Sequence, residues 1–228
     1  MFDVSKQDIS AVFDHSLRAV IFDMDGVIVD SERLHLQANV EVLARNGIDL
    51  TPDEVINLTF GKRALDHFRD IVEIYGTGSE DIESWVVWKT NRYFELAETK
   101  LDLISGFREF FDVCRSLEYE IALVTSGTSD VQYPVLDRFG LRDIFDVSVM
   151  GDEVKRAKPD PEPYLLATSR LEIDPSHCIV FEDSDSGIRS AKAAGCRVAG
   201  IANTMSRERL LEAGADLVID GFAELMNE

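Results

Sequence analysis

Two aspartates follow a short apolar run near the beginning of the chain. The run covers residues 19–22, and Asp23, Asp25 and Gly26 lie in the next four positions. Burying an unpaired carboxylate costs several kcal/mol, so such a pair is a poor core feature. Carboxylate oxygens are ligands for Mg²⁺, and a carboxylate can attack an electrophile. The pair therefore predicts a site for metal-assisted chemistry at the end of a strand.

Two further apolar runs end in polar residues of different chemistry. Thr125 and Ser126 follow one of these runs, and Glu182 and Asp183 follow the other. In an open α/β sheet, ligands bind beyond the carboxyl ends of the strands. We therefore expect these hydroxyl and carboxylate groups to meet the aspartate pair at one edge of a sheet.

Lys158 supplies a cation next to a proline. Proline restrains the preceding residue to extended backbone, and an ammonium group on a stiff backbone suits a phosphoryl oxygen. Carboxylates for Mg²⁺, the Thr125 hydroxyl and this lysine together fit phosphoryl transfer. A second aspartate can protonate the leaving oxygen and later deprotonate water.

Strand-like and helix-like segments alternate along most of the chain. Strands are expected at 19–23, 120–124, 146–150, 178–182, 197–201 and 217–219, and helices at 106–117, 129–139, 161–171, 185–194 and 206–213. Short continuous apolar runs are typical of parallel strands that are covered on both faces. The alternation predicts an α/β fold, a Rossmann-like three-layer core with a parallel sheet.

Residues 33–103 interrupt this alternation with helical periodicity alone. Helices are expected at 33–46, 52–58, 62–75 and 80–98. Thr51, Pro52 and Glu54 form a capping-box sequence at one helix start. We predict a small inserted α-helical cap domain at 33–103 and a catalytic core made of residues 1–32 and 104–228.

Four short motifs resemble, in order and spacing, those of the haloacid dehalogenase superfamily. They are Asp23-x-Asp25-Gly26-Val27, Thr125-Ser126, Lys158-Pro159 and Glu182-Asp183-Ser184-x-x-Gly187. The resemblance covers the chain from about residue 18 onward. It is nearest to members with a small helical cap: phosphoglycolate phosphatases, sugar-phosphate phosphatases and β-phosphoglucomutase.

The resemblance implies roles for the motif residues. Asp23 would be the nucleophile and Asp25 the general acid and base. Mg²⁺ would bind the Asp23 carboxylate, the Asp25 backbone carbonyl and Asp183, with Glu182 in or beside the metal shell. Dehalogenation is not expected, because the dehalogenases lack the second aspartate of this loop.

The resemblance also implies residues that bind the substrate. In the core they are Thr125, Ser126, Lys158 and Gly26; in the cap they are His35 and Arg63. His35 falls where mutase-like caps have a histidine, and Arg63 belongs to a basic sequence resembling a substrate-reading loop. Two alternatives stay open, namely that Thr125 is only a helix N-cap and that the basic cap residues are ordinary solvated groups.

Composition excludes several classes of partner. The formal net charge of −20 disfavours nucleic acid and anionic membrane surfaces. Three scattered cysteines do not suggest a disulfide framework. With no signal peptide and no apolar run long enough to span a membrane, we expect a cytoplasmic protein, either a monomer or a small homo-oligomer.

The expected function is Mg²⁺-dependent hydrolysis of a small phosphorylated metabolite, through an aspartyl-phosphate intermediate. The substrate would be a phosphomonoester such as a sugar phosphate or phosphoglycolate. One alternative is a sugar phosphomutase of the β-phosphoglucomutase type. A lower-ranked alternative is a phospho-accepting regulatory module that resembles a receiver domain. A non-catalytic relative that only binds a partner is the weakest.

Overall fold

The computed structural model describes residues 14–59, 62–76 and 81–226, which form two compact units. One unit contains the described chain up to Ile28 and again from Leu103 onward, and the other is Val29–Asp102. The second unit thus begins at Val29, where the sequence suggested residue 33. Each unit is described by itself below.

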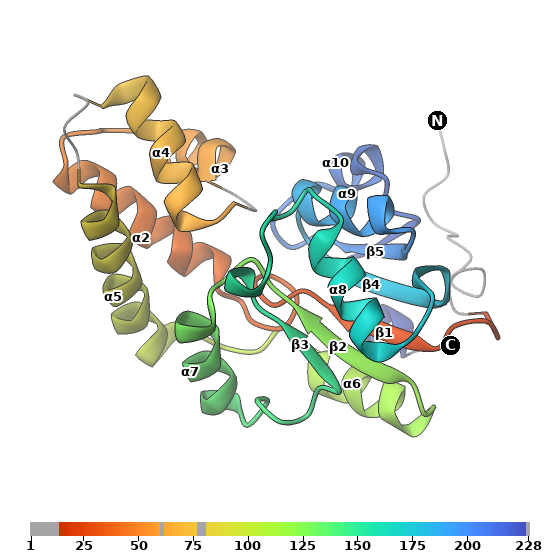
Figure 1. The fold of residues 1–228 in the computed structure, drawn as a ribbon. Coiled ribbons are helices and arrows are strands. Elements are labelled where there is room, and N and C mark those ends of the chain that lie inside the picture. The colour runs from red at the N-terminus through yellow and green to blue at the C-terminus, as the bar shows by residue number, and fades with distance from the viewer. Residues whose placement is uncertain (1–13, 60–61, 77–80, 227–228) are drawn as a thin grey trace. The chain divides into compact units, whose positions relative to one another are not determined.

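A six-stranded, all-parallel sheet forms the centre of the first unit (Figure 1). Its strands are β1 (Ala19–Phe22), β2 (Glu120–Val124), β3 (Val147–Val149), β4 (Cys178–Glu182), β5 (Arg197–Ile201) and β6 (Leu217–Ile219). The strand order is β3-β2-β1-β4-β5-β6, so β1 lies between β2 and β4. The loops after these three strands therefore leave the sheet side by side at its carboxyl edge.

Helices cover both faces of this sheet. They are α6 (Phe107–Ser116), α7 (Ser129–Phe139), α8 (Glu162–Leu171), α9 (Asp185–Ala194) and α10 (Arg207–Ala213). Helix α9 contacts both α8 and α10, and all three contact the strands, so they form one layer. Helix α6 packs on the opposite face, where the Phe107 ring lies 5.4 Å from that of Phe22. The predicted α/β class with a Rossmann-like layered core is confirmed.

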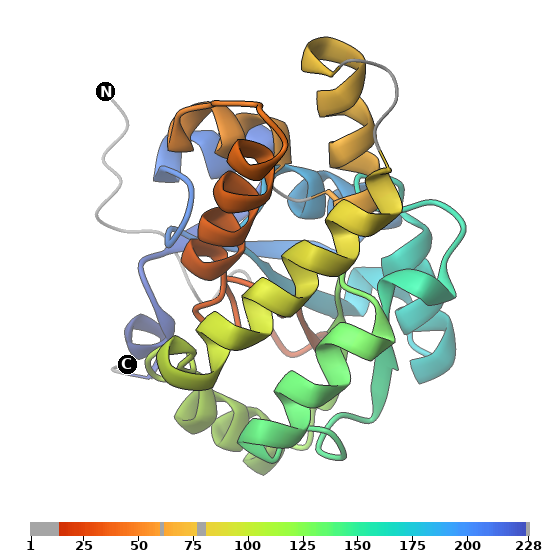
Figure 2. The same ribbon diagram turned by 90° about the vertical axis from the view of Figure 1, so that its left-hand side faces the viewer.

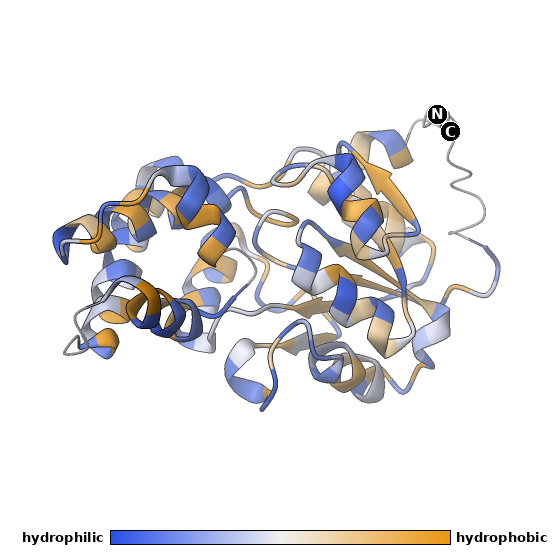
Figure 3. Cartoon of the chain, turned by 90° about the horizontal axis from the view of Figure 1, so that it is seen from above, coloured by the Kyte–Doolittle hydropathy of each residue, from blue (hydrophilic) through white to orange (hydrophobic). Residues whose placement is uncertain are grey.

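Hydropathy explains why these segments form a core. All four residues of β1 and all five of β4 are buried, and Figure 3 shows the strands as mainly hydrophobic. Removing apolar surface from water contributes about 25 cal/mol for each Å² buried, so such runs are stable only inside the layers. Among the described residues, no helix combines the length and apolar character needed to cross a membrane.

The second unit is helical over its described residues. Its helices are α2 (Glu32–Arg45), α3 (Pro52–Thr59), α4 (Ala64–Tyr75) and α5 (Ile82–Lys100). Helices α2 and α5 pack against each other (Figure 2). Trp85 is buried in this unit's core, with its ring 5.9 Å from that of Phe68.

The capping box at the start of α3 is present as predicted. Thr51 donates from its backbone N–H to Glu54 at 2.8 Å, and the Glu54 N–H donates to the Thr51 hydroxyl at 3.4 Å. Each side chain thus satisfies a backbone donor that the helix itself leaves without an acceptor.

Candidate active site

Three carboxylates meet at the carboxyl edge of the sheet. Asp23, Glu182 and Asp183 are buried, and each offers a ligand oxygen within 4.8 Å of the others. The register of β1 and β4 pairs Phe22 with Phe181, so the residues that follow both strands lie together. Buried oxygen ligands at this spacing fit a hard divalent cation, since carboxylates so close together need positive charge between them.

Lys158 supplies part of that positive charge. Its ammonium group donates to Asp23 Oδ1 at 2.5 Å, to Glu182 Oε1 at 2.7 Å and to the Val124 carbonyl at 3.2 Å. These contacts use all three of its N–H donors. Burial lowers the pKa of Lys158, but the two carboxylates outweigh that effect and raise it above its ordinary value. Lys158 is therefore a charged group that holds two of the three acids.

The same network has opposing effects on the pKa of Asp23. Burial raises the pKa of the Asp23 carboxyl well above its ordinary value, Lys158 opposes this rise, and Glu182 and Asp25 add to it. A nucleophilic carboxylate must be ionised, so the Asp23–Lys158 contact favours the reactive form. A bound cation would also favour the ionised form of Asp23.

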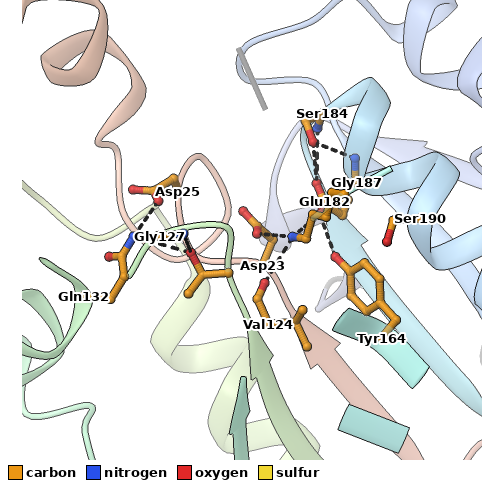
Figure 4. A network of polar contacts seen from close by, with 12 residues as sticks. Asp23, Asp25, Val124, Gly127, Gln132, Tyr164, Glu182, Ser184, Gly187 and Ser190 are labelled. Carbon is orange, nitrogen blue, oxygen red and sulfur yellow. Dashed lines mark hydrogen bonds and ion pairs between the residues drawn. The ribbon is translucent and has the colours of Figure 1, made fainter. Parts of the chain in front are cut away.

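Both carboxylate oxygens of Glu182 accept hydrogen bonds from neighbouring side chains (Figure 4). Tyr164 donates to Oε1 at 2.6 Å, and the Ser184 hydroxyl donates to Oε2 at 2.9 Å. A Cβ on Gly187 would lie 1.9 Å from Oε1, so helix α9 approaches this carboxylate as closely as a glycine permits. Glu182 is thereby fixed in one orientation.

The loop after β5 brings two residues that the sequence analysis missed. Thr204 donates from its hydroxyl to Asp183 Oδ2 at 2.9 Å. Asn203 donates from its side-chain amide to the Gly26 carbonyl at 2.9 Å. The available signal was that this loop also follows an apolar strand at the same sheet edge.

Thr125 and Asp25 are joined by a third residue that was missed, Gln132. Thr125 Oγ1 accepts hydrogen bonds from the Gly127 N–H at 3.0 Å and from Gln132 Nε2 at 3.4 Å. The same Gln132 nitrogen donates to Asp25 Oδ2 at 2.9 Å. The N-cap of α7 is Thr128, so the alternative that Thr125 caps this helix is wrong. Ser126 lies half-buried on the same loop.

Comparison with known proteins identifies the family. A family model described as haloacid dehalogenase-like hydrolase matches residues 20–201, which is most of the chain. This chain belongs to that family. The membership confirms the predicted superfamily and shows a hydrolase, and it does not support a receiver-like module.

Similar proteins include named phosphatases. A phosphorylated carbohydrates phosphatase from Thermotoga maritima is 37% identical to this haloacid dehalogenase-like hydrolase over 205 residues, covering 87% of this chain and 92% of the relative. A variant of CbbY from Rhodobacter sphaeroides, solved in complex with xylulose-(1,5)bisphosphate, is 29% identical with a TM-score of 0.81, covering 92% and 96% of the two chains. A β-phosphoglucomutase from Clostridium difficile is 27% identical with a TM-score of 0.79, covering 92% and 93%.

The other candidate residues of this hydrolase lie in the second unit. His35 on α2 contacts Lys89 of α5 through Nδ1 at 2.9 Å, and its ring stacks on Tyr93 at 4.1 Å between ring centres. Arg63 precedes α4 and is half-buried. Gly61, the first residue of the expected basic loop, lies outside the described residues. The structure thus gathers the core candidates at one sheet edge and places the cap candidates within Val29–Asp102.

Proposed function

We propose that this protein is a Mg²⁺-dependent phosphatase that hydrolyses a small phosphorylated carbohydrate. The observation that carries the proposal is the position of Asp23. It contacts the Lys158 ammonium at 2.5 Å and shares a buried cluster with two further carboxylates within 4.8 Å. The relative from Thermotoga maritima, named a phosphorylated carbohydrates phosphatase, supports the substrate class.

Mg²⁺ would be held by the carboxylates of Asp23 and Asp183 and by the backbone carbonyl of Asp25. Glu182 already accepts hydrogen bonds on both oxygens, which favours a place beside the metal shell rather than in it. When bound, the ion would offset charge on the phosphoryl oxygens and orient them for displacement.

The residues of the chain would then perform two displacements at phosphorus. In the first, an oxygen of Asp23 forms a bond to phosphorus as the ester P–O bond breaks. The leaving oxygen keeps that electron pair and takes a proton from Asp25. In the second, a water molecule gives a proton to Asp25 and its oxygen bonds to phosphorus while the bond between phosphorus and the Asp23 oxygen breaks, so that phosphate leaves and the Asp23 carboxylate keeps the electron pair.

Neighbouring groups would bind the phosphoryl oxygens. Thr125 Oγ1 already accepts two hydrogen bonds, so its own O–H is the group that can donate to an anionic oxygen. The phosphoryl oxygens would also be contacted by Ser126 and Gly26 and attracted by the positive charge of Lys158. His35 and Arg63 would contact the part of the substrate that carries the sugar hydroxyls.

The test is phosphate release from a panel of small phosphomonoesters that includes sugar phosphates and phosphoglycolate. We expect release with Mg²⁺ and none with EDTA. Asp23→Asn should abolish turnover while melting at a temperature similar to wild type. Release that persists in Asp23→Asn would contradict the aspartyl-phosphate route, and release only from non-carbohydrate esters would contradict the substrate class.

A sugar phosphomutase is the second candidate. The similarity to the β-phosphoglucomutase from Clostridium difficile favours it, together with the sequence resemblance that implies a mutase-like role for His35. Incubation with β-glucose 1-phosphate separates the two functions. A mutase would form the 6-phosphate isomer without free phosphate, whereas a phosphatase would release phosphate in proportion to the ester consumed.

A further inference from the structure

We propose that Gln132 is a positioning residue that holds the Asp25 carboxylate in the orientation needed for proton transfer. This inference rests on the proposed function, because it concerns the residue that would act there as acid and base. It assigns a role to a side chain outside the four motifs that define the candidate site.

The contacts place one amide between two loops of the site. Gln132 lies in the first turn of α7 and is only 2% exposed. Its Nε2 donates to Asp25 Oδ2 at 2.9 Å (Figure 4). The same nitrogen donates to Thr125 Oγ1 at 3.4 Å. Asp25 lies in the loop after β1, and Thr125 lies in the loop after β2. Gln132 therefore sets the distance between the proposed acid and the proposed phosphate-binding hydroxyl.

Gly127 provides the space that this amide occupies. A Cβ at Gly127 would lie 2.0 Å from Gln132 Nε2 and 2.7 Å from the amide carbon. Real Cβ atoms do not approach other atoms so closely, so any larger residue at position 127 would displace the Gln132 amide. The position of the Gln132 amide therefore requires a glycine at position 127.

The chemistry of an amide suits this position. Asp25 would have to release a proton to the leaving oxygen and later accept one from water, and an amide keeps the same donor in both states because it does not titrate. The hydrogen bond to Oδ2 therefore holds the carboxyl group in one orientation in both protonation states. A titratable side chain in place of Gln132 would compete for the proton.

Gln132 also has a cost for stability. Among the described residues its Oε1 is buried without a hydrogen-bond partner, and a buried acceptor without a donor lowers the stability of the fold. A residue that served only packing could be a methionine of similar length and shape. The glutamine therefore fits a role in the site better than a role in the core.

The test compares esters with poor and good leaving groups. An alkyl leaving group needs a proton as it departs, whereas the 4-nitrophenolate ion does not. For Gln132→Met we expect kcat/KM on the best sugar phosphate to fall by about tenfold to a hundredfold, as a partial loss of general acid catalysis. On 4-nitrophenyl phosphate it should fall by less than about threefold, with no loss of melting temperature. Asp25→Asn serves as the reference and should show the same selectivity more strongly.

A second variant tests the same contact without altering Gln132. Gly127→Ala should reproduce the selective loss, and the double variant Gly127→Ala/Gln132→Met should be no worse than either single change, because both remove one interaction. Ser129→Ala, in the same turn of α7 but bonded to Asp152, should leave both activities unchanged.

Two results would overturn the inference while the proposed function stands. One is an equal loss on both esters in Gln132→Met and in Gly127→Ala, which would indicate general damage to the fold. The other is no loss on either ester. If the wild type releases no phosphate, or if Asp23→Asn stays active, the proposed function itself fails and this inference fails with it.

Discussion

Gly26 and Asp183 lie so close that no side chain fits between them. A Cβ added to Gly26 would stand 1.9 Å from Asp183 Oδ2 and 2.6 Å from its carboxyl carbon. Gly26 also has φ of +78°, which residues other than glycine seldom adopt. The glycine after the aspartate pair is therefore required by the carboxylate that it faces as well as by its backbone.

Gly26→Ala should weaken metal binding more than it weakens the fold. The backbone strain costs about 1–2 kcal/mol, and the clash displaces Asp183 from the acidic cluster. Gly47→Ala is the matched control, because Gly47 has the same φ of +78° with nothing within 4 Å of the added Cβ. Unfolding in urea should give similar losses for both variants, whereas calorimetry with Mg²⁺ should show weaker affinity only for Gly26→Ala. Equal affinities would contradict the prediction.

Tyr164→Phe should destabilise the core through Glu182. The Tyr164 hydroxyl donates to Glu182 Oε1 at 2.6 Å, and both side chains are fully buried. Loss of a donor to a buried carboxylate costs about 1.5–3 kcal/mol of the free energy of unfolding. Tyr133→Phe on the half-buried face of α7 should change it by less than about 0.5 kcal/mol. Denaturant unfolding measures both, and an equal effect of the two changes would count against this account.

Mg²⁺ should stabilise the folded protein through Asp183. A ligand that binds only the native state at a hundred times its Kd adds about 2.7 kcal/mol, which raises the melting temperature. EDTA should reverse the rise. Asp183→Asn should abolish most of the response, whereas Asp185→Asn should keep it, since Asp185 pairs with Arg189 at 2.5 Å instead. A full response in Asp183→Asn would place the metal elsewhere.

His67 should make the second unit sensitive to acid. Burial lowers the pKa of His67 well below its ordinary value, and Lys89, Lys62 and His35 add to this effect. The unfolded chain binds the proton more readily, so this contribution to stability is complete above about pH 6.5. It is lost as the pH falls from there towards the lowered pKa of the folded state.

The change His67→Phe should remove this part of the pH dependence. The wild type should lose up to about 1.4 kcal/mol of unfolding free energy per pH unit from His67 below pH 6.5, and the variant should lack that slope. His177→Gln, at an exposed histidine, is the control and should keep the wild-type slope. Urea unfolding between pH 7 and pH 5 measures the difference, and parallel curves for wild type and His67→Phe would refute it.

The strands and most helix ends were predictable because their signals are local. Buried runs such as 178–181 are apolar without interruption, which is typical of a strand covered on both faces. Helix α7 ends at Gly140 and α9 at Gly195, both in the left-handed conformation typical of helix ends. The capping box of Thr51 and Glu54 is equally local.

By itself, the sequence determined the class of fold, the family and the groups that could do chemistry. It could do so because polar clusters after apolar strands must gather at one edge of a parallel sheet. The expected grouping of Asp23, Glu182 and Asp183 needed only that rule.

Only the tertiary structure decided which other side chains serve those groups. The order β3-β2-β1-β4-β5-β6 brings the loop after β5 beside β4, and so Thr204 beside Asp183. Gln132 reaches Asp25 across 107 positions of sequence. Glutamine and threonine are common on helices and in loops, so their residue types carry no local signal. Their roles arise from distances that exist only once the strands are ordered and the helices packed.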